Sequence, residues 1–200
     1  MLKLINNSQT RIIEEVFKNP GINLRTLIQR TGLSPNFVSE YINLLIKKEI
    51  VTEEKFEKQR VYLRRFFLNF KSNLTKNLFS LIKEEQKENF FRKYQKFRPV
   101  FNQIIENIKK TDFFLVYGSY ARLAADEDSD LDILIVGKVT DTEKIREILV
   151  SLDIEVSIKI ETYSDFKKRI KEPLHQQILK DNILVSENNN KFIGLLLDYR

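Results

Sequence analysis

The chain has 200 residues, of which 42% are hydrophobic, 31% charged and 11% aromatic, the composition of an ordinary globular protein. It contains no Cys and one His, which excludes a disulfide framework and a Cys-based zinc site. A bound metal would therefore have oxygen ligands, as Mg²⁺ does. No run approaches the roughly 18 apolar residues of a membrane span, and the start lacks the apolar core of a signal peptide, so we expect a cytoplasmic protein.

The net charge of +6 is unevenly distributed along the chain. Residues 1–70 contain 12 Lys and Arg against 7 Asp and Glu, and residues 71–110 contain 10 against 4. Residues 111–200 reverse the sign, with 12 against 17. A basic first half favours a polyanionic partner and an acidic second half favours cations, which together indicate two domains.

The first segment has the pattern of a helix-turn-helix. Apolar residues at helical spacing predict a helix over 8–17, and a second helix is expected after Asn23. Gly32 allows a sharp turn, Ser34 can cap the following helix, and Pro35 suits its first position. Two helices joined by a short turn that contains Gly make up this motif.

Two β-prone runs, 50–52 and 60–63, follow and flank a charged segment. Residues 8–68 thus resemble the winged helix of MarR/ArsR-type transcription regulators. The resemblance implies that residues 34–48 form a recognition helix for the major groove of double-stranded DNA, where polar side chains read bases and basic ones neutralise phosphates. The implied DNA-binding residues are Asn36, Ser39, Asn43, Lys47, Lys55, Lys58 and Arg60.

Two residues depart from this family pattern. Glu40 places a negative charge on the expected reading face, and Glu49 stands where the family usually has Gly before the wing. A winged helix that serves protein contacts or dimerisation is therefore the alternative to DNA binding.

A helical connector is expected over residues 73–110, which contain no Gly and only Pro99 as a helix breaker. An apolar stripe runs along it, formed by Phe79, Ile82, Phe90, Tyr94, Phe97, Phe101, Ile104, Ile105 and Ile108. Basic residues between the aromatic ones would also suit nucleic-acid stacking. We interpret the stripe as a domain or homodimer interface, because apolar residues at helical spacing are more often a packing surface.

The most informative segment combines two apolar strands with a polar loop. The first strand, from Phe113, runs into Gly118 and Ser119, which would let backbone N–H groups and a hydroxyl approach a phosphate. The second strand opens with Asp130 and Asp132, two residues apart and therefore on one face. Such a carboxylate pair among apolar residues predicts a divalent cation that bridges to a nucleoside triphosphate.

This order of motifs resembles the polymerase-β-type nucleotidyltransferase superfamily, especially its minimal members, over about residues 105–185. The family signature is a strand, Gly-Ser, about a dozen residues, and Asp-apolar-Asp. The resemblance implies that Gly118, Ser119 and Arg122 bind the nucleotide. It also implies that Asp130 and Asp132 are catalytic and bind Mg²⁺ or Mn²⁺.

Two departures concern activity. Leu123 stands where the minimal members usually carry a second Gly, and the third catalytic carboxylate of the family would fall at Ser157. Glu155 shares the alternating face with Ser157 and is longer, so we expect it to act as the third catalytic residue.

Together these patterns predict an α+β protein: a winged helix-turn-helix domain over 1–70, a helical connector for dimerisation over 71–110, and a small mixed α/β nucleotidyltransferase-fold domain over 111–200. The predicted function is DNA-binding transcription regulation combined with Mg–NTP binding and nucleotidyl transfer to a hydroxyl acceptor. The alternatives are a non-catalytic nucleotide sensor and an antitoxin-like module paired with a small helical protein.

Overall fold

The structure is a computed structural model that describes residues 6–58, 61–107, 111–139 and 141–197. Arg60 and Ile108 lie outside the described residues, as does the side chain of Lys58. The chain forms two units, of which one ends at Ser80 and the other begins at Leu81. We call them unit 1 and unit 2 and describe each by itself.

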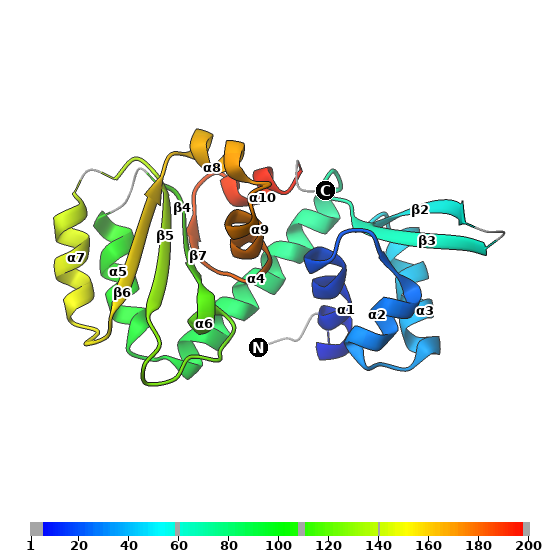
Figure 1. Ribbon diagram of the computed structural model, residues 1–200, viewed down its shortest axis with the longest axis horizontal. Coiled ribbons are helices and arrows are strands. Elements are labelled where there is room, and N and C mark those ends of the chain that lie inside the picture. Colours follow the sequence, from blue (N-terminus) through cyan, green and yellow to red (C-terminus); the bar gives the residue numbers. More distant parts are fainter. Residues whose placement is uncertain (1–5, 59–60, 108–110, 140, 198–200) are drawn as a thin grey trace. The chain divides into compact units, whose positions relative to one another are not determined.

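Unit 1 has the winged helix-turn-helix topology. Its elements are α1 (Asn7–Lys18), β1 (Ile22–Asn23), α2 (Leu24–Thr31), α3 (Pro35–Lys47), β2 (Val51–Lys58) and β3 (Val61–Leu68). The strands form an antiparallel sheet in the order β1-β3-β2, and β2 and β3 make the long hairpin of the wing (Figure 1). The two-residue β1 was not predicted, because it is too short to show a periodic pattern.

Local capping residues explain where the helices of unit 1 begin and end. The side chains of Asn6, Asn23 and Ser34 each accept a hydrogen bond from the third backbone N–H of the helix that follows. Gly32 ends α2 in the left-handed conformation, with φ of 62°, as the predicted turn requires. The helix-turn-helix is therefore set by residues close together in the sequence.

The core of unit 1 follows the predicted helix faces. The buried residues are Ile12, Ile13, Val16 and Phe17 of α1, Leu27 of α2, and Val38, Tyr41, Ile42 and Leu45 of α3. Tyr41 is buried in α3, whereas Ile46 is half-buried.

The expected connector is divided between the two units. It consists of α4 (Asn73–Lys93), within which the boundary falls, and α5 (Phe97–Asn107), which belongs to unit 2. The chain leaves the helical conformation at residues 94–96. Pro99 lies in the first turn of α5, where its missing N–H removes no helical hydrogen bond.

The apolar stripe is a packing surface, as predicted, and the chain itself covers most of its residues. Those that are buried inside the chain are Phe79, Ile82, Phe90, Phe97, Phe101 and Ile104. The ring centroids of Phe90 and Phe97 lie 5.5 Å apart, so the turn at 94–96 folds the stripe onto itself. The homodimer stays a prediction, without support from this stripe.

Unit 2 is built on a four-stranded mixed sheet. Its remaining elements are β4 (Thr111–Tyr117), α6 (Gly118–Ala121), β5 (Leu131–Gly137), α7 (Thr142–Val150), β6 (Val156–Glu161), α8 (Tyr163–Arg169), α9 (Pro173–Lys180), β7 (Ile183–Glu187) and α10 (Lys191–Leu195). The strand order is β6-β5-β4-β7, in which β5 and β6 are parallel and the other pairs antiparallel.

Helices cover both faces of this sheet (Figure 1). Successive residues of β4 point to opposite faces. Phe113 packs against Phe166 of α8 and Phe192 of α10, with ring centroids 5.5 Å apart in both pairs. Phe114 packs on the other face against Phe101 of α5, at 5.1 Å. The sheet is thus buried on both sides, and polar groups concentrate at the strand ends.

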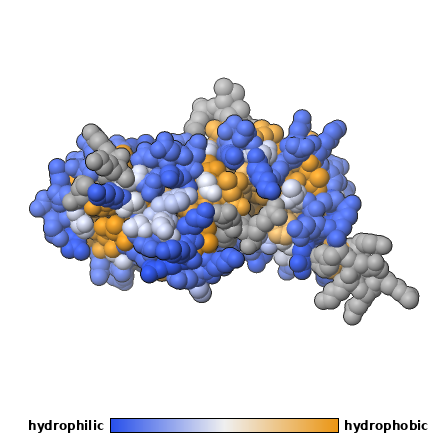
Figure 2. Space-filling view, turned by 90° about the horizontal axis from the view of Figure 1, so that it is seen from above, coloured by the Kyte–Doolittle hydropathy of each residue, from blue (hydrophilic) through white to orange (hydrophobic). Residues whose placement is uncertain are grey.

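Within the described ranges, no helix is both long and apolar enough to cross a bilayer. On the face shown in Figure 2, apolar residues form separate small areas among hydrophilic ones.

Glu49, the residue that replaces the family's Gly before the wing, adopts the conformation that Gly favours. Its φ is 57°, and its side chain is exposed. A residue with a Cβ in this left-handed region is strained by roughly 1 kcal/mol. We therefore predict that Glu49→Gly raises the free energy of unfolding by about 0.5–1 kcal/mol, measured by urea denaturation.

The control is Lys48→Gly at the neighbouring exposed position, where φ is −89°. That change relieves no strain and adds freedom to the unfolded chain, so it should lower stability. A loss of stability in both variants would contradict the prediction.

Candidate functional site

The turn after β4 is built around Gly118. Its φ is 73°, which disfavours any residue with a side chain. A Cβ at this position would also collide with Oδ2 of Asp132 on the neighbouring strand. The backbone conformation therefore requires Gly118, and a side chain here would also displace the Asp132 carboxylate.

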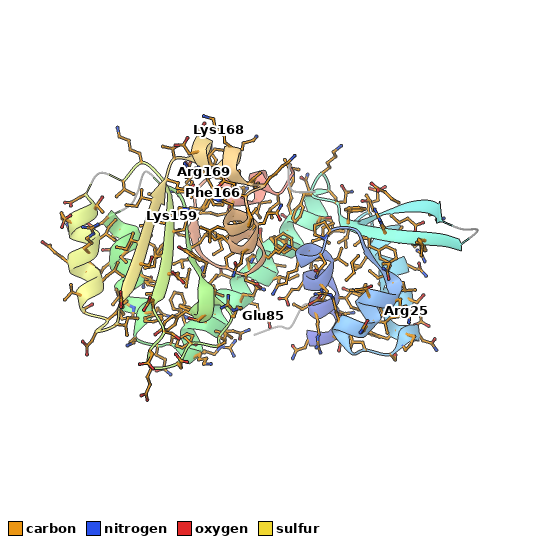
Figure 3. All side chains as sticks on the ribbon, in the orientation of Figure 1. Arg25, Glu85, Lys159, Phe166, Lys168 and Arg169 are labelled. Atoms are coloured by element: carbon orange, nitrogen blue, oxygen red, sulfur yellow. The ribbon has the colours of Figure 1, made fainter. Side chains whose placement is uncertain are left out.

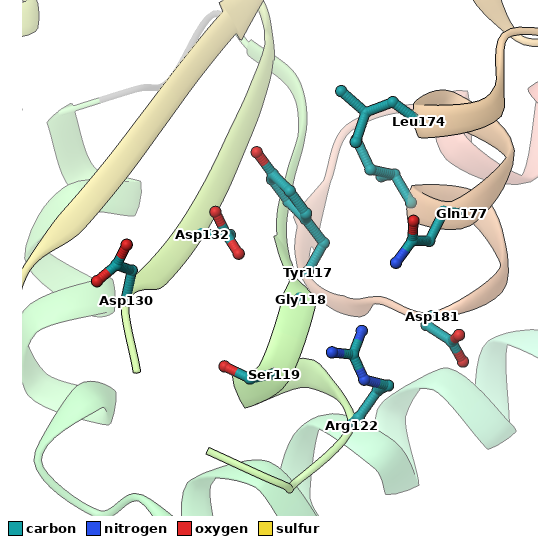
Figure 4. A pocket seen from close by; sticks show the side chains of 10 residues that line it. Tyr117, Gly118, Ser119, Arg122, Asp130, Asp132, Leu174, Gln177 and Asp181 are labelled. Atoms are coloured by element: carbon teal, nitrogen blue, oxygen red, sulfur yellow. The ribbon is translucent and has the colours of Figure 1, made fainter. Parts of the chain in front are cut away.

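Ser119 and Arg122 follow in and directly after the single turn of α6. Because α6 has only four residues, an anion here would be held by individual N–H groups, the Ser119 hydroxyl and the Arg122 guanidinium rather than by a helix dipole. Figure 4 shows both side chains at the same opening as the strand-end carboxylates.

The two predicted metal-binding carboxylates lie at the start of β5. Asp130 is exposed and directly precedes the strand, whereas Asp132 is half-buried within it. Burial, together with the negative charge of Asp130, raises the pKa of the Asp132 carboxyl above its ordinary value, while Arg122 acts in the opposite direction. The pair is thus a site of unfavourable negative charge that a cation would relieve.

The position of the third family carboxylate holds a hydroxyl. In the parallel pairing of β5 and β6, Ser157 is the direct partner of Asp132. Glu155 precedes β6, and its carbonyl oxygen accepts a hydrogen bond from the N–H of Leu131 at 2.9 Å. Its side chain is exposed, and Glu155 is not among the described residues that line the cavity discussed next.

A cavity of about 500 Å³ joins these groups to α9. Its lining residues are Tyr117, Gly118, Ser119, Arg122, Asp130, Asp132, Leu174, Gln177, Ile178 and Asp181. The structure therefore brings together five of the six residues expected to bind nucleotide or metal or to act in catalysis, all except Glu155. The sequence did not indicate Tyr117 as part of the site, nor the residues on or next to α9, Leu174, Gln177, Ile178 and Asp181. The spacing of these four residues predicts a common helix face, but it does not predict which part of the chain that face contacts.

The departure at Leu123 has a backbone explanation. Its φ is 57°, so it adopts the left-handed conformation for which the minimal family members use Gly. Lys93 of α4 donates a hydrogen bond from Nζ to the Leu123 carbonyl oxygen at 2.6 Å. The Leu123 side chain also packs against the core of unit 2, which helps to offset the strain of this turn.

A buried ion-pair cluster lies on the same side of the sheet, at the end of β6. His175 of α9 is 1% exposed, and its Nε2 lies 3.0 Å from Oε2 of Glu161. Lys159 Nζ lies 2.8 Å from Oε1 of Glu161, and Arg169 of α8 lies close to the same group (Figure 3). Burial alone would raise the pKa of the Glu161 carboxyl, but the hydrogen bonds from Lys159 and His175 hold it below its ordinary value. This cluster ties α9, one wall of the cavity, to the sheet.

The expected DNA-reading face of α3 is available in unit 1. Asn36, Asn43 and Lys47 are exposed and Ser39 is half-buried. Arg64 of β3 donates hydrogen bonds to Oδ1 of Asn43 at 3.0 Å and to Oε2 of Glu53 at 2.6 Å. Arg64 thus links the wing to α3. The sequence did not predict this link, because Arg64 and Asn43 are far apart in the chain.

Wing residue Lys55 is exposed, and its Nζ lies 3.2 Å from Oε1 of Glu53. Glu53 is therefore shared between Lys55 and Arg64, which lessens the positive charge that the wing presents.

Comparison with known sequences agrees with both units. Residues 5–52 match the family described as winged helix-turn-helix DNA-binding, and residues 101–191 match the family described as polymerase beta, nucleotidyltransferase. The chain thus joins a winged helix-turn-helix domain to a nucleotidyltransferase domain of the polymerase-beta type. No curated protein sequence matches it.

Two solved structures show a distant likeness. One is a toxin–antitoxin with AMP-PNP, with 16% sequence identity over 50% of this chain and 85% of that chain, at a TM-score of 0.37. The other is a mutant of the toxin–antitoxin MntA-HpeT, with 14% identity over 48% and 81% of the two chains, at a TM-score of 0.35.

The Glu161 cluster leads to a pH-dependent prediction. Because the folded-state pKa of Glu161 lies below the ordinary value of 4.5, its stabilisation is complete above that pH and is lost as the pH falls through the lowered pKa. We expect Glu161→Gln to reduce the free energy of unfolding by about 2–3 kcal/mol at pH 7 and by much less at pH 3, measured by urea denaturation.

Glu172→Gln is the matched control. Its carboxylate lies 3.7 Å from Nδ1 of His175, and its side chain is 59% exposed, so this change should alter stability by less than about 0.5 kcal/mol. An equal loss for Glu161→Gln at both pH values would rule out the ionised carboxylate as the stabilising group.

Proposed function

We propose that unit 2 binds a nucleoside triphosphate with a divalent cation and transfers its nucleotidyl group to a hydroxyl acceptor. The observation that carries this proposal is the packing of the Gly118 turn directly against Asp132, with Asp130 beside it, at one cavity. Gly118, Ser119 and Arg122 would hold the phosphates there.

The residues present fit Mg²⁺ or Mn²⁺ as a site shared with the nucleotide. Among the described residues, no group of three or more His, Asp and Glu side chains could hold a metal by itself. Asp130 and Asp132 would supply two carboxylates, and phosphate oxygens and water would complete the shell, as is usual for magnesium. When bound, the ion would neutralise charge on the transferring phosphate.

The remaining chemistry falls to the chain's own groups. The acceptor oxygen attacks the α-phosphorus as the bond to the β-phosphate oxygen breaks, and pyrophosphate leaves. The acceptor proton would need a carboxylate, and Glu155, the residue predicted for this role, would have to reach the acceptor from outside the cavity lining. Arg122 would stabilise the negative charge on the phosphates as the bond breaks.

A second candidate function is nucleotide sensing without transfer. It is favoured by the pairing of Ser157 with Asp132, because a hydroxyl at this position neither binds a cation as strongly as a carboxylate does nor accepts a proton at neutral pH.

Labelled nucleotide and Mg²⁺ separate these two functions. We expect wild-type protein, incubated with its acceptor mixture, to incorporate label from α-labelled ATP or GTP. Asp132→Asn should reduce the incorporation by at least about 100-fold, because it removes charge where the phosphate reacts.

Asp128→Asn is the control, an equal change at an exposed position of the acidic loop outside the cavity lining. Nucleotide binding without any incorporation by the wild type would favour the sensor. Equal incorporation by wild type and Asp132→Asn would exclude this carboxylate from the reaction.

We further propose that unit 1 binds double-stranded DNA and makes the protein a transcription regulator. The support is the exposed polar face of α3 beside a hairpin wing, together with the match of residues 5–52 to a DNA-binding family. Asn36, Ser39 and Asn43 would read bases, and Lys47 and Lys55 would contact phosphates.

Salt dependence tests this interface. Lys47→Glu should weaken DNA binding about three- to tenfold and reduce the slope of log affinity against log salt by about one, the loss of one phosphate contact. Binding would be measured by fluorescence anisotropy over a salt series. Lys144→Glu on α7 makes the same charge change on an exposed residue of unit 2 and should leave the slope unchanged. Equal slopes for the wild type and Lys47→Glu would contradict this placement of DNA.

A further inference from the structure

One wall of the cavity is a single face of α9. Leu174, Gln177, Ile178 and Asp181 all line it, and their spacing of three, four and seven residues places them on one side of the helix. Asp181 is the residue that ends the helix. His175 lies in the first turn of α9 and forms a hydrogen bond with Glu161 of β6. This bond fixes the orientation of the wall relative to the sheet.

The chemistry of this wall differs from that of the opposite side. Ser119, Asp130 and Asp132 supply charge and polar oxygens (Figure 4). Along α9 the lining consists of Leu174, which is 45% exposed, the neutral amide of Gln177, the buried Ile178, and the carboxylate of Asp181 where the helix ends. A nucleotide has the same division, with charged phosphates at one end and an uncharged, flat base at the other.

Electrostatics fix which end of a nucleotide would meet α9. The carboxyl end of a helix carries partial negative charge, and Asp181 stands at that end with a carboxylate. Ser119 and Arg122 can donate hydrogen bonds to phosphates, and a cation held by Asp130 and Asp132 would attract them to the same side. The base is left to contact Leu174 and Gln177, the exposed residues of the α9 face.

We propose that the α9 face is the nucleobase subsite of this domain, an inference that rests on the proposed nucleotide binding. Leu174 packs against the flat face of the base, and Ile178, which is buried one turn further along α9, supports it from behind. The Gln177 amide offers a donor and an acceptor together and pairs with an edge of the base. Because a two-ring base covers more of the aliphatic surface than a one-ring base, purine triphosphates bind more tightly than pyrimidine triphosphates.

Calorimetric titration of the full-length chain in excess Mg²⁺ tests this subsite. The probes are ATP, GTP, CTP, UTP and inorganic tripolyphosphate, which has the three phosphates but neither ribose nor base. We expect the preferred purine triphosphate to bind at least about tenfold more tightly than tripolyphosphate. Leu174→Ala and Gln177→Ala should each weaken purine binding about three- to tenfold and leave tripolyphosphate binding unchanged.

The matched control is Gln176→Ala, the same change at the preceding residue, which does not line the cavity. It should leave every dissociation constant within about twofold of the wild-type value. Leu174 and Gln177 are exposed, so their variants are expected to fold, and circular dichroism checks this.

The outcomes separate this inference from the proposed function. If tripolyphosphate and all four nucleotides bind equally, the phosphate site stands and the base subsite is overturned. If the purine advantage persists in both variants, the base lies elsewhere and the subsite is also overturned. If no probe binds to folded wild-type protein, the proposed function fails and the subsite fails with it.

Discussion

The close approach of Asp132 to Gly118 is the constraint on which unit 2 depends. A half-buried carboxylate beside a second one is electrostatically unfavourable, and burial and Asp130 both raise its pKa. The chain accommodates it by leaving no side chain at the neighbouring turn and by placing Arg122 one helical turn further on. This arrangement, which a cation and a polyphosphate would relieve, supports the proposed nucleotide site.

At two positions the chain keeps the backbone conformation of the families it resembles although the residue differs. At Glu49 and at Leu123 the related families use Gly, and both residues here have φ of 57°. The fold therefore keeps the left-handed turn even where the side chain disfavours it. At Leu123 a hydrogen bond from Lys93 and burial against the core hold the turn, whereas Glu49 is exposed.

On the cavity side of the sheet, one residue of β6 lies at the proposed reaction site and another stabilises the fold. Ser157, opposite Asp132, occupies the place where the family carries its third carboxylate. Glu161 lies four residues further along the strand, where His175 and Lys159 hold it in a buried ion pair. Glu161 therefore anchors α9 and is not available to replace the missing group, which leaves Glu155, a residue that precedes the strand and lies outside the cavity lining, as the candidate.

The sequence by itself determined the elements whose signals are local. Helix caps at Asn23 and Ser34, the turn at Gly32, and the Gly-Ser and Asp-x-Asp motifs each depend on residues a few positions apart, so the winged helix and the two strands of the site could be read from them. Only the tertiary structure decided what the aromatic stripe packs against within the chain, that α9 closes the cavity, and that Glu161 pairs with His175. An amphipathic face reveals that a helix packs against something, but its partner is set by chain folding over tens of residues.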